Sequence, residues 1–304
     1  MDQAHDRTPS SQLLDELKRT APLELARLAP DRPDLLEKLE TYLNEVPVAL
    51  GLLAPLLDAE TPRRILEVGS GIGAVTACLR ADGHEVIAIE PAGPGFRDMR
   101  LLQRAIEVTV AALQSGAASS DLSPLPIGVD DLDPAVHGRF DVVFSANVLE
   151  HVPDPISALE RMQSVLAEGG VQRHVCPNYA FPYEPHFFLP LVPFVPSLTR
   201  LLLPSRITQT GLWESLNFVT ARQVHRWARR ASAEVRFDRG VLAEAVERFL
   251  ADPVFAERHS GLSSVVRVLE RLGVVPLLRK LPAGTVSPMR FTIAASAPRS
   301  SIEG

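Results

Sequence analysis

A cluster of glycines directly after a short apolar run constrains the fold of this chain more than any other feature. The run is Ile65-Leu66-Glu67-Val68, and Gly69, Gly71 and Gly73 follow it. Glycine is needed where a strand turns sharply into a helix, because the turn uses backbone angles that other residues avoid and lets a ligand approach the main chain. The pattern predicts an α/β sheet with a nucleotide-like ligand beside this turn.

From Arg63 onward, short apolar runs alternate with helical segments, which is typical of a parallel sheet built from βαβ units. Asp154, Pro155 and the pair Gly169-Gly170 supply start and stop signals for one helix, and Thr220 is the expected cap of a later one. The predicted strands are about Arg64–Val68, Glu85–Glu90, Pro126–Gly128, Phe140–Ala146, Val171–Pro177 and Ala233–Phe237, with MRFTIAASA as the closing strand. The predicted helices between them are about Ala74–Ala81, Gly95–Ser115 and Ile156–Ala167.

One predicted strand, Val171–Pro177, is more polar than a fully buried parallel strand should be. It contains Gln172, Arg173 and His174 in succession. Either a neighbouring element supplies partners for these side chains, or this edge of the sheet is partly open.

The flanking segments are expected to be helical. Residues 1–60 are predicted to form a tail and a helical extension, with helices over about Ser11–Leu28 and Pro33–Leu57 whose apolar residues recur at helical spacing. Residues 61–304 are predicted to form one domain with cap insertions at 178–219 and 241–284. The most apolar stretch, Phe187–Pro204, is interrupted by Arg200 and four prolines, which favours a cap over a membrane span.

Composition excludes several classes of protein. A net charge of −6 argues against a nucleic-acid-binding surface, which needs a dense basic patch. The two cysteines, Cys78 and Cys176, cannot form a disulfide framework, and no Cys/His cluster has the spacing of a metal site. The amino terminus lacks the pattern of a signal peptide. We therefore expect a cytoplasmic enzyme without a bound metal and without a transmembrane segment.

Glu67 indicates which nucleotide-like ligand the turn holds. The glycines also satisfy the dinucleotide fingerprint, and Glu90, about 20 residues on, suits the ribose of either kind of cofactor. A carboxylate two residues before Gly69 would repel a pyrophosphate, whereas it would pair with the amino group of a methionine moiety. The competing interpretation is that Glu67 pairs with a nearby Lys or Arg, or caps the backbone.

Together these motifs resemble class I S-adenosylmethionine-dependent methyltransferases, in particular the small-molecule group that includes ubiquinone-biosynthesis O-methyltransferases. The resemblance covers about residues 63–180 and lies in LEVGSGIG, VIAIEP, FDVVFSANVLEHVPDP and VLAEGG. It implies a Rossmann-like, seven-stranded and mostly parallel sheet with helices on both faces, whose last strand is antiparallel, and S-adenosyl-L-methionine as the cofactor. By the same resemblance the cofactor-binding residues are Glu67, Gly69, Ser70, Gly71, Gly73, Glu90, Pro91, Asp130 and Asn147.

Methyl transfer from a sulfonium is an in-line displacement that depends on positioning, and removal of a proton helps when the acceptor is a hydroxyl. His151 is the candidate base, with an orienting or structural role as its alternative. Tyr179, Tyr183 and His186 lie in the first insertion, where the resemblance places acceptor-binding loops, and the aromatic residues around them suit an apolar acceptor. We therefore predict methylation of a small, hydrophobic or lipid-like molecule, with O-methylation favoured and peripheral contact with a membrane left open.

Three further interpretations stay open at this point. Arg222, Arg226, Arg229 and Arg230 line one side of a predicted helix, either as a solvated face or as a site for an anionic acceptor. An NAD-dependent oxidoreductase would share the sheet and the glycine turn. A non-catalytic, methyltransferase-like partner protein would keep the fold without the reaction.

Overall fold

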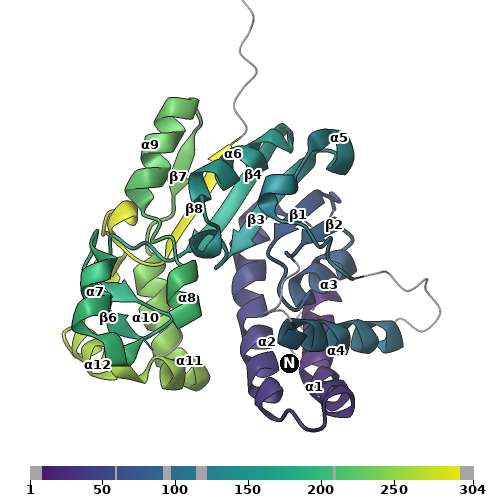
Figure 1. Ribbon diagram of the computed structural model, residues 1–304, viewed down its shortest axis with the longest axis horizontal. Helices are drawn as coiled ribbons and strands as arrows, with labels where there is room; N and C mark the ends of the chain where they lie inside the picture. Colours follow the sequence, from purple (N-terminus) through teal and green to yellow (C-terminus); the bar gives the residue numbers. More distant parts are fainter. Residues whose placement is uncertain (1–8, 59, 92–96, 114–121, 208–209, 295–304) are drawn as a thin grey trace, which may run out of the picture. The chain divides into compact units, whose positions relative to one another are not determined.

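The computed structural model describes residues 9–58, 60–91, 97–113, 122–207 and 210–294 (Figure 1). In this part of the chain a six-stranded sheet has the order β2-β1-β3-β4-β8-β7. β1 (Arg64–Val68) pairs in parallel with β2 (Glu85–Ile89) and with β3 (Phe140–Ala146). The closing strand β8 (Met289–Ala294) is antiparallel to β7 (Val235–Phe237), as the resemblance implied. The fold is α/β and Rossmann-like.

The prediction of seven strands is wrong, because Pro126–Gly128 is not a strand of the sheet. The segment joins β2 through a single parallel bridge between Ile89 and Leu125. Leu125 donates to the carbonyl of Ala88, and its own carbonyl accepts from the amide of Glu90. Prolines stand on both sides of Leu125 and have no N–H to donate, so the pairing cannot extend along the chain.

The chain separates into two compact units. The first contains residues 1–146 and 161–172, and the second contains residues 147–160 and 173–304. β4 (Leu166–Cys176) supplies residues to both units.

The core of the first unit contains apolar faces of four helices: α1 (Pro9–Leu28), α2 (Asp34–Leu53), α3 (Ala74–Ala81) and α4 (Arg97–Leu113). The predicted stripe on α2 is buried, with Leu35, Leu39, Leu43 and Val46 at most 2% exposed. α2 ends four residues earlier than expected, and a 3-10 turn, η1 (Ala54–Leu56), follows it. Pro55 explains the change, because its missing N–H and its ring disfavour a continuing α-helix.

Two predicted helix starts are confirmed. The Asp154 carboxylate accepts from the amides of Ile156 and Ser157 at the start of α6 (Pro155–Ser164). Thr220 caps α9 (Ala221–Ala231) through a reciprocal pair of hydrogen bonds with Gln223.

The predicted stop of α6 at Gly169-Gly170 is wrong. The helix ends at Ser164, and both glycines lie inside β4. A Cβ on Gly170 would lie 2.8 Å from the carbonyl oxygen of Phe140, so this glycine lets β4 approach β3 closely.

The polar residues of β4 all have partners, which decides between the two alternatives raised by the sequence. Gln172, Arg173 and His174 are buried. Gln172 donates to Gln163, Arg173 pairs with Asp238 and donates to Thr292, and His174 packs against Phe291. β4 is also an inner strand of the sheet rather than an edge.

The second unit contains many short elements in residues 178–219 and 241–284, the two segments that the sequence predicts as insertions. A two-stranded sheet, β5 (Tyr183–Glu184) with β6 (Leu189–Pro190), lies in the first insertion together with α7 (Pro196–Leu202) and α8 (Thr210–Ser215). The second insertion is helical and contains α10 (Val241–Ala251), α11 (Pro253–Arg258), α12 (Ser263–Arg271) and α13 (Val275–Leu278). None of the helices in the described ranges combines the length and the apolar character that a bilayer crossing requires.

Candidate functional site

The glycine turn of the first unit has the backbone geometry that only glycine adopts easily. Gly69, Gly71 and Gly73 have φ values of 76°, 52° and 76°. The amide of Gly69 donates to the carbonyl of Ile89, and that of Gly73 donates to Ser70. A Cβ built on Gly71 would have its nearest neighbour, a ring carbon of Tyr42, 4.0 Å away. The turn is therefore rigid and has free space on the side where a ligand would lie.

Glu67 is a buried carboxyl group beside this turn. It is 4% exposed and accepts a hydrogen bond from the hydroxyl of Thr76 on α3. In the described part of the chain the hydrogen bond to Glu67 comes from this hydroxyl, and the positive charge of Arg80 favours the ionised carboxylate without outweighing its burial. Burial raises the pKa of Glu67 to about 8. A cationic group brought in by a ligand would offset the cost of charging this carboxyl.

Glu90, at the end of β2, is tied to the same turn. Its carboxylate accepts from the amide of Gly71 at 2.8 Å, and burial raises its pKa. The side-chain amide of Gln103 donates to the carbonyl of Gly71 at 2.7 Å. Sequence reasoning missed Tyr42, Thr76 and Gln103. Tyr42 and Gln103 lie on helices whose contact with the turn no local pattern reveals. Thr76 lies on α3 directly after the turn, but its spacing alone does not show that it donates to Glu67.

The other predicted cofactor residues occupy different settings. Ser70 is buried, and its hydroxyl lacks a hydrogen-bond partner within the described residues. Pro91 is exposed after Glu90. Asp130 is exposed on the 3-10 helix η3 (Val129–Asp131). Asn147, exposed and with a φ of 56°, begins the second unit, where its amide donates to Val175.

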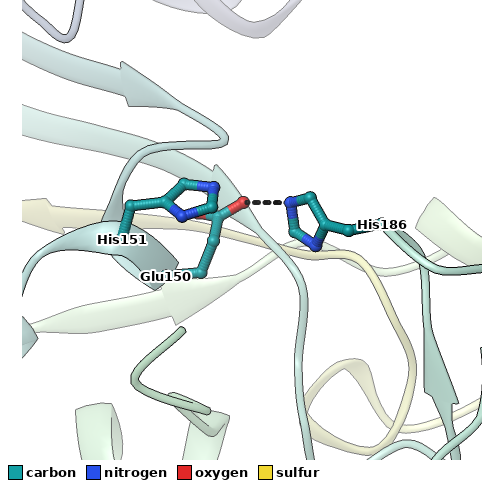
Figure 2. A group of neighbouring side chains, drawn as sticks. All are labelled: Glu150, His151 and His186. Atoms are coloured by element: carbon teal, nitrogen blue, oxygen red, sulfur yellow. Dashed lines mark ion pairs between the residues drawn. The ribbon is translucent and has the colours of Figure 1, made fainter. Parts of the chain in front are cut away.

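The second unit brings His186 close to two adjacent residues, Glu150 and His151, that are distant from it in sequence. Glu150 and His151 lie on the 3-10 helix η4 (Leu149–His151), and His186 lies between β5 and β6 (Figure 2). Asn217 fixes η4, because its side-chain amide donates to the carbonyls of Leu149 and Val152, each at 2.6 Å. Of these three side chains, the sequence singled out the two histidines but not Glu150.

The two histidines are oriented by hydrogen bonds. Nδ1 of His186 lies 2.6 Å from Oε1 of Glu184, and its Nε2 lies 4.0 Å from Oε1 of Glu150. Nδ1 of His151 lies 3.1 Å from Oγ of Ser215. The two imidazole rings meet edge to face with their centroids 5.1 Å apart. Glu184 is fully buried and also accepts from the amide of Phe187.

Burial sets the protonation states of this cluster. It raises the pKa of Glu150 to about 7 and lowers that of His151 to about 4. Burial also opposes the charging of His186, but the hydrogen bond to Glu184 and the negative charges of Glu184 and Glu150 together outweigh it and raise the pKa of His186. At neutral pH His151 is therefore uncharged, whereas Glu150 titrates.

A cavity of about 280 Å³ lies in the same unit. Its lining combines apolar and aromatic side chains with polar residues of α9: Tyr179, Leu191, Phe194, Pro196, Phe218, Thr220, Arg222, Gln223 and Arg226. Tyr179 is 1% exposed, stacks edge to face on Phe218 and directs its hydroxyl toward Glu184. Tyr183 is half-buried, and its buried hydroxyl lacks a partner in the described ranges.

Comparisons with known proteins show which proteins this chain is similar to. Residues 35–236 match the model of a methyltransferase domain. An uncharacterised protein of Mycobacterium tuberculosis strain H37Rv is 36% identical over 234 residues, which are 74% of this chain and 76% of that protein. The ubiquinone biosynthesis O-methyltransferase of Alkalilimnicola ehrlichii is 29% identical over 195 residues, 64% of this chain and 70% of that enzyme.

The solved structure of an S-adenosylmethionine-dependent methyltransferase from Mesorhizobium loti aligns with this chain at 12% identity and a TM-score of 0.47. The alignment covers 82% of this chain and 97% of that protein's chain. The residue range matched by the domain model includes the glycine turn, η4 and His186. Both groups of side chains described above therefore lie inside the matched domain.

Proposed function

Because this chain belongs to the class I S-adenosylmethionine-dependent methyltransferases, we propose that it methylates an oxygen atom of a small, apolar acceptor. The observation that supports this proposal most is the cavity of the second unit, about 280 Å³ in volume, in which Leu191, Phe194 and Phe218 form an apolar wall alongside the polar residues of α9, Arg222 and Arg226 among them. A cavity of this size and lining suits a compact ring or a short acyl chain. The name of the relative from Alkalilimnicola ehrlichii, an O-methyltransferase, supports the choice of oxygen.

The first unit supplies the residues that we propose for the cofactor. Glu67 would take the methionine amino group, because its buried carboxyl gains a charged partner there. Gly69, Ser70, Gly71 and Gly73 would surround the methionine end of the ligand, and Glu90 would accept from the ribose hydroxyls. Pro91, Asp130 and Asn147 complete the proposed set.

The chemistry needs a nucleophilic oxygen in line with the methyl group. The acceptor oxygen forms a bond to the methyl carbon as the carbon–sulfur bond breaks, and S-adenosylhomocysteine leaves with the electron pair. The hydroxyl proton must go to a base. We propose His151 or its neighbour Glu150 for this role, since His151 is uncharged at neutral pH and the pKa of Glu150 is about 7.

Tyr179, Tyr183 and His186 are the residues that we propose for acceptor binding. Tyr179 contributes to the cavity wall. The unpartnered hydroxyl of Tyr183 offers a hydrogen bond to a polar group of the acceptor.

The proposal is tested with S-adenosylmethionine that carries a deuterated methyl group and with matched acceptors. A set of phenols and long-chain alcohols is compared with amines of the same skeleton, and the products are identified by mass spectrometry. We expect label on oxygen and a preference for the less polar members. Label on nitrogen alone, or a preference for highly polar acceptors, would show that the proposed acceptor class is wrong.

A further inference from the structure

The cluster of Glu150, His151 and His186 presents three potential ligand atoms to a common point. One ligand atom from each residue can be chosen such that all lie within 4.8 Å of one another. Glu150 is fully buried, and within the described residues neither of its carboxylate oxygens has a hydrogen-bond partner. Figure 2 shows its carboxylate directed toward the imidazole of His186. Charging a buried carboxyl group that has no partners is costly unless a cation lies beside it, so this arrangement suits a cation.

The hydrogen bonds of the two histidines show which nitrogen atoms stay available. Glu184 can only accept, so the proton of neutral His186 lies on Nδ1, and Nε2 keeps its lone pair. The Ser215 hydroxyl donates to the carbonyl of Leu212, so its oxygen accepts from Nδ1–H of His151. In both rings the lone pair therefore lies on Nε2, the nitrogen that a metal ion can use.

We propose that Glu150, His151 and His186 bind a divalent transition-metal ion, with Zn²⁺ as the reference ion. Two imidazoles and one carboxylate form a donor set that suits Zn²⁺ or Fe²⁺ better than Mg²⁺ or Ca²⁺, which prefer oxygen ligands only. Three protein ligands leave at least one coordination position for water or another oxygen ligand.

The surrounding residues support a metal ion at this point. A metal-binding histidine commonly donates its second N–H to a carboxylate, which fixes the ring and strengthens the metal bond. Glu184 holds His186 in this way at 2.6 Å, and Ser215 holds His151. Ligands at about 2.1 Å from one ion are about 3.4 Å apart in a tetrahedron. Side-chain rotations that shorten these separations by up to about 1.4 Å, from 4.8 Å to about 3.4 Å, therefore suffice.

This inference does not depend on which molecule is methylated. Metal binding and the role of His151 as a base are alternatives, because a metal bond would occupy the lone pair that accepts the proton. The same holds for the carboxylate of Glu150, so either residue can serve as the base only in the metal-free protein. The test therefore uses metal binding itself and needs neither S-adenosylmethionine nor an acceptor.

The test is calorimetric titration of the chelator-treated full chain with Zn²⁺, together with the visible absorption of the Co²⁺ form. We expect one ion per chain with micromolar or tighter affinity, and Co²⁺ bands typical of nitrogen and oxygen ligands. E150Q, H151Q and H186Q should each weaken binding at least tenfold. E184Q should weaken it about 10- to 100-fold by releasing His186. The control H225Q removes an exposed imidazole outside the cluster and should bind as the wild type does.

Two outcomes would overturn the proposal. The first is a folded wild-type protein that takes up no Zn²⁺ or Co²⁺ at low micromolar concentration. This result does not depend on whether any variant folds. The second is uptake of one ion with unchanged affinity in folded E150Q and H186Q, which would place the metal elsewhere.

Discussion

At the scale of single residues, Glu67 has the most specific proposed task. A glutamine of the same shape keeps the Thr76 hydrogen bond but cannot pair with an amino group as a carboxylate does. We expect E67Q to weaken the binding of S-adenosylhomocysteine about 10- to 100-fold, which corresponds to the loss of one charged hydrogen bond. Calorimetric titration measures this change.

The control for E67Q is a second ligand. 5′-Methylthioadenosine lacks the amino-acid part of the cofactor, so its affinity should change by less than about twofold if Glu67 contacts the amino group. An equal loss for both ligands would show that the variant disturbs the whole turn, and the specific role of Glu67 would then be wrong.

The two candidate bases, Glu150 and His151, should give different pH dependences of methyl transfer. In metal-free protein, a base with a pKa of about 7 gives a rate that rises with pH and levels off above neutrality, whereas a base with a pKa of about 4 gives no such rise between pH 5 and 8. We expect the rise, and we expect E150Q to remove it and to lower kcat about 100-fold. Measurement of kcat/KM against pH checks both.

H151Q and the surface control H225Q complete this comparison. Both variants should bind S-adenosylhomocysteine within about twofold of the wild type. A wild-type profile that is flat from pH 5 to 8, together with a large loss of kcat in H151Q alone, would identify His151 as the base and exclude Glu150.

At the scale of elements, the polar segment of β4 depends on one acidic residue. Arg173, 6% exposed, pairs with Asp238, and Asp238 also pairs with Arg290. Removal of this carboxylate would leave a buried guanidinium without its ionic partner, which typically costs 3–5 kcal/mol. We expect D238A to lower the free energy of unfolding by about 3 kcal/mol in urea denaturation, because Asp238 itself is only partly buried.

The matched control is E234A, which breaks the exposed pair of Glu234 with Arg236. Exposed ion pairs contribute little to stability, so this variant should change the free energy of unfolding by less than about 0.5 kcal/mol. Equal effects of the two substitutions would show that the buried pair is not important for β4.

Elements with a local signature could be predicted from the sequence, and those set by contacts far along the chain could not. β1, β3 and α3 have their predicted bounds, since an apolar run or a glycine start marks each end. The prediction of a helix end at Gly169-Gly170 is wrong because Gly170 allows a close approach between strands, which depends on the distant residue Phe140. The prediction of a third strand at Pro126–Gly128 is wrong because the spacing of apolar residues does not show how prolines limit hydrogen bonding between strands.

The same distinction applies to the candidate site. Glu67 and the three glycines lie within one short motif, so the sequence suffices to group them. Glu150 and His186 come together only through the folding of the first insertion, and no spacing rule connects them. The hydrogen bond by which Glu184 orients His186 could not be predicted, because a buried hydrogen-bonded carboxylate looks like a surface acid in the sequence.

At the scale of the whole molecule, each unit contains a buried carboxyl group that folding keeps protonated near neutral pH. The pKa is about 8 for Glu67 and about 7 for Glu150, against an ordinary value of 4.5. The folded protein therefore retains protons that the unfolded chain releases, so the free energy of unfolding falls as pH rises through 7 and 8. His186 acts in the same direction above pH 6.5, because its pKa is also raised.

The pH window for a test follows from the buried histidines. The lowered pKa values of His151 and His174, about 4 and about 3, reduce stability only when pH falls below about 6.5. Between pH 6.5 and 8 the carboxyl groups dominate, and we expect the metal-free, ligand-free protein to lose about 1–3 kcal/mol. The double variant E67Q/E150Q should lose much less stability over this range, because only the contribution of His186 remains. D98N is the control, because Asp98 is paired, has a pKa of about 2 and stays charged throughout the window, so its effect should be the same at every pH. Urea denaturation at several pH values measures the slope, and an unchanged slope in the double variant would contradict the assignment of these protons to Glu67 and Glu150.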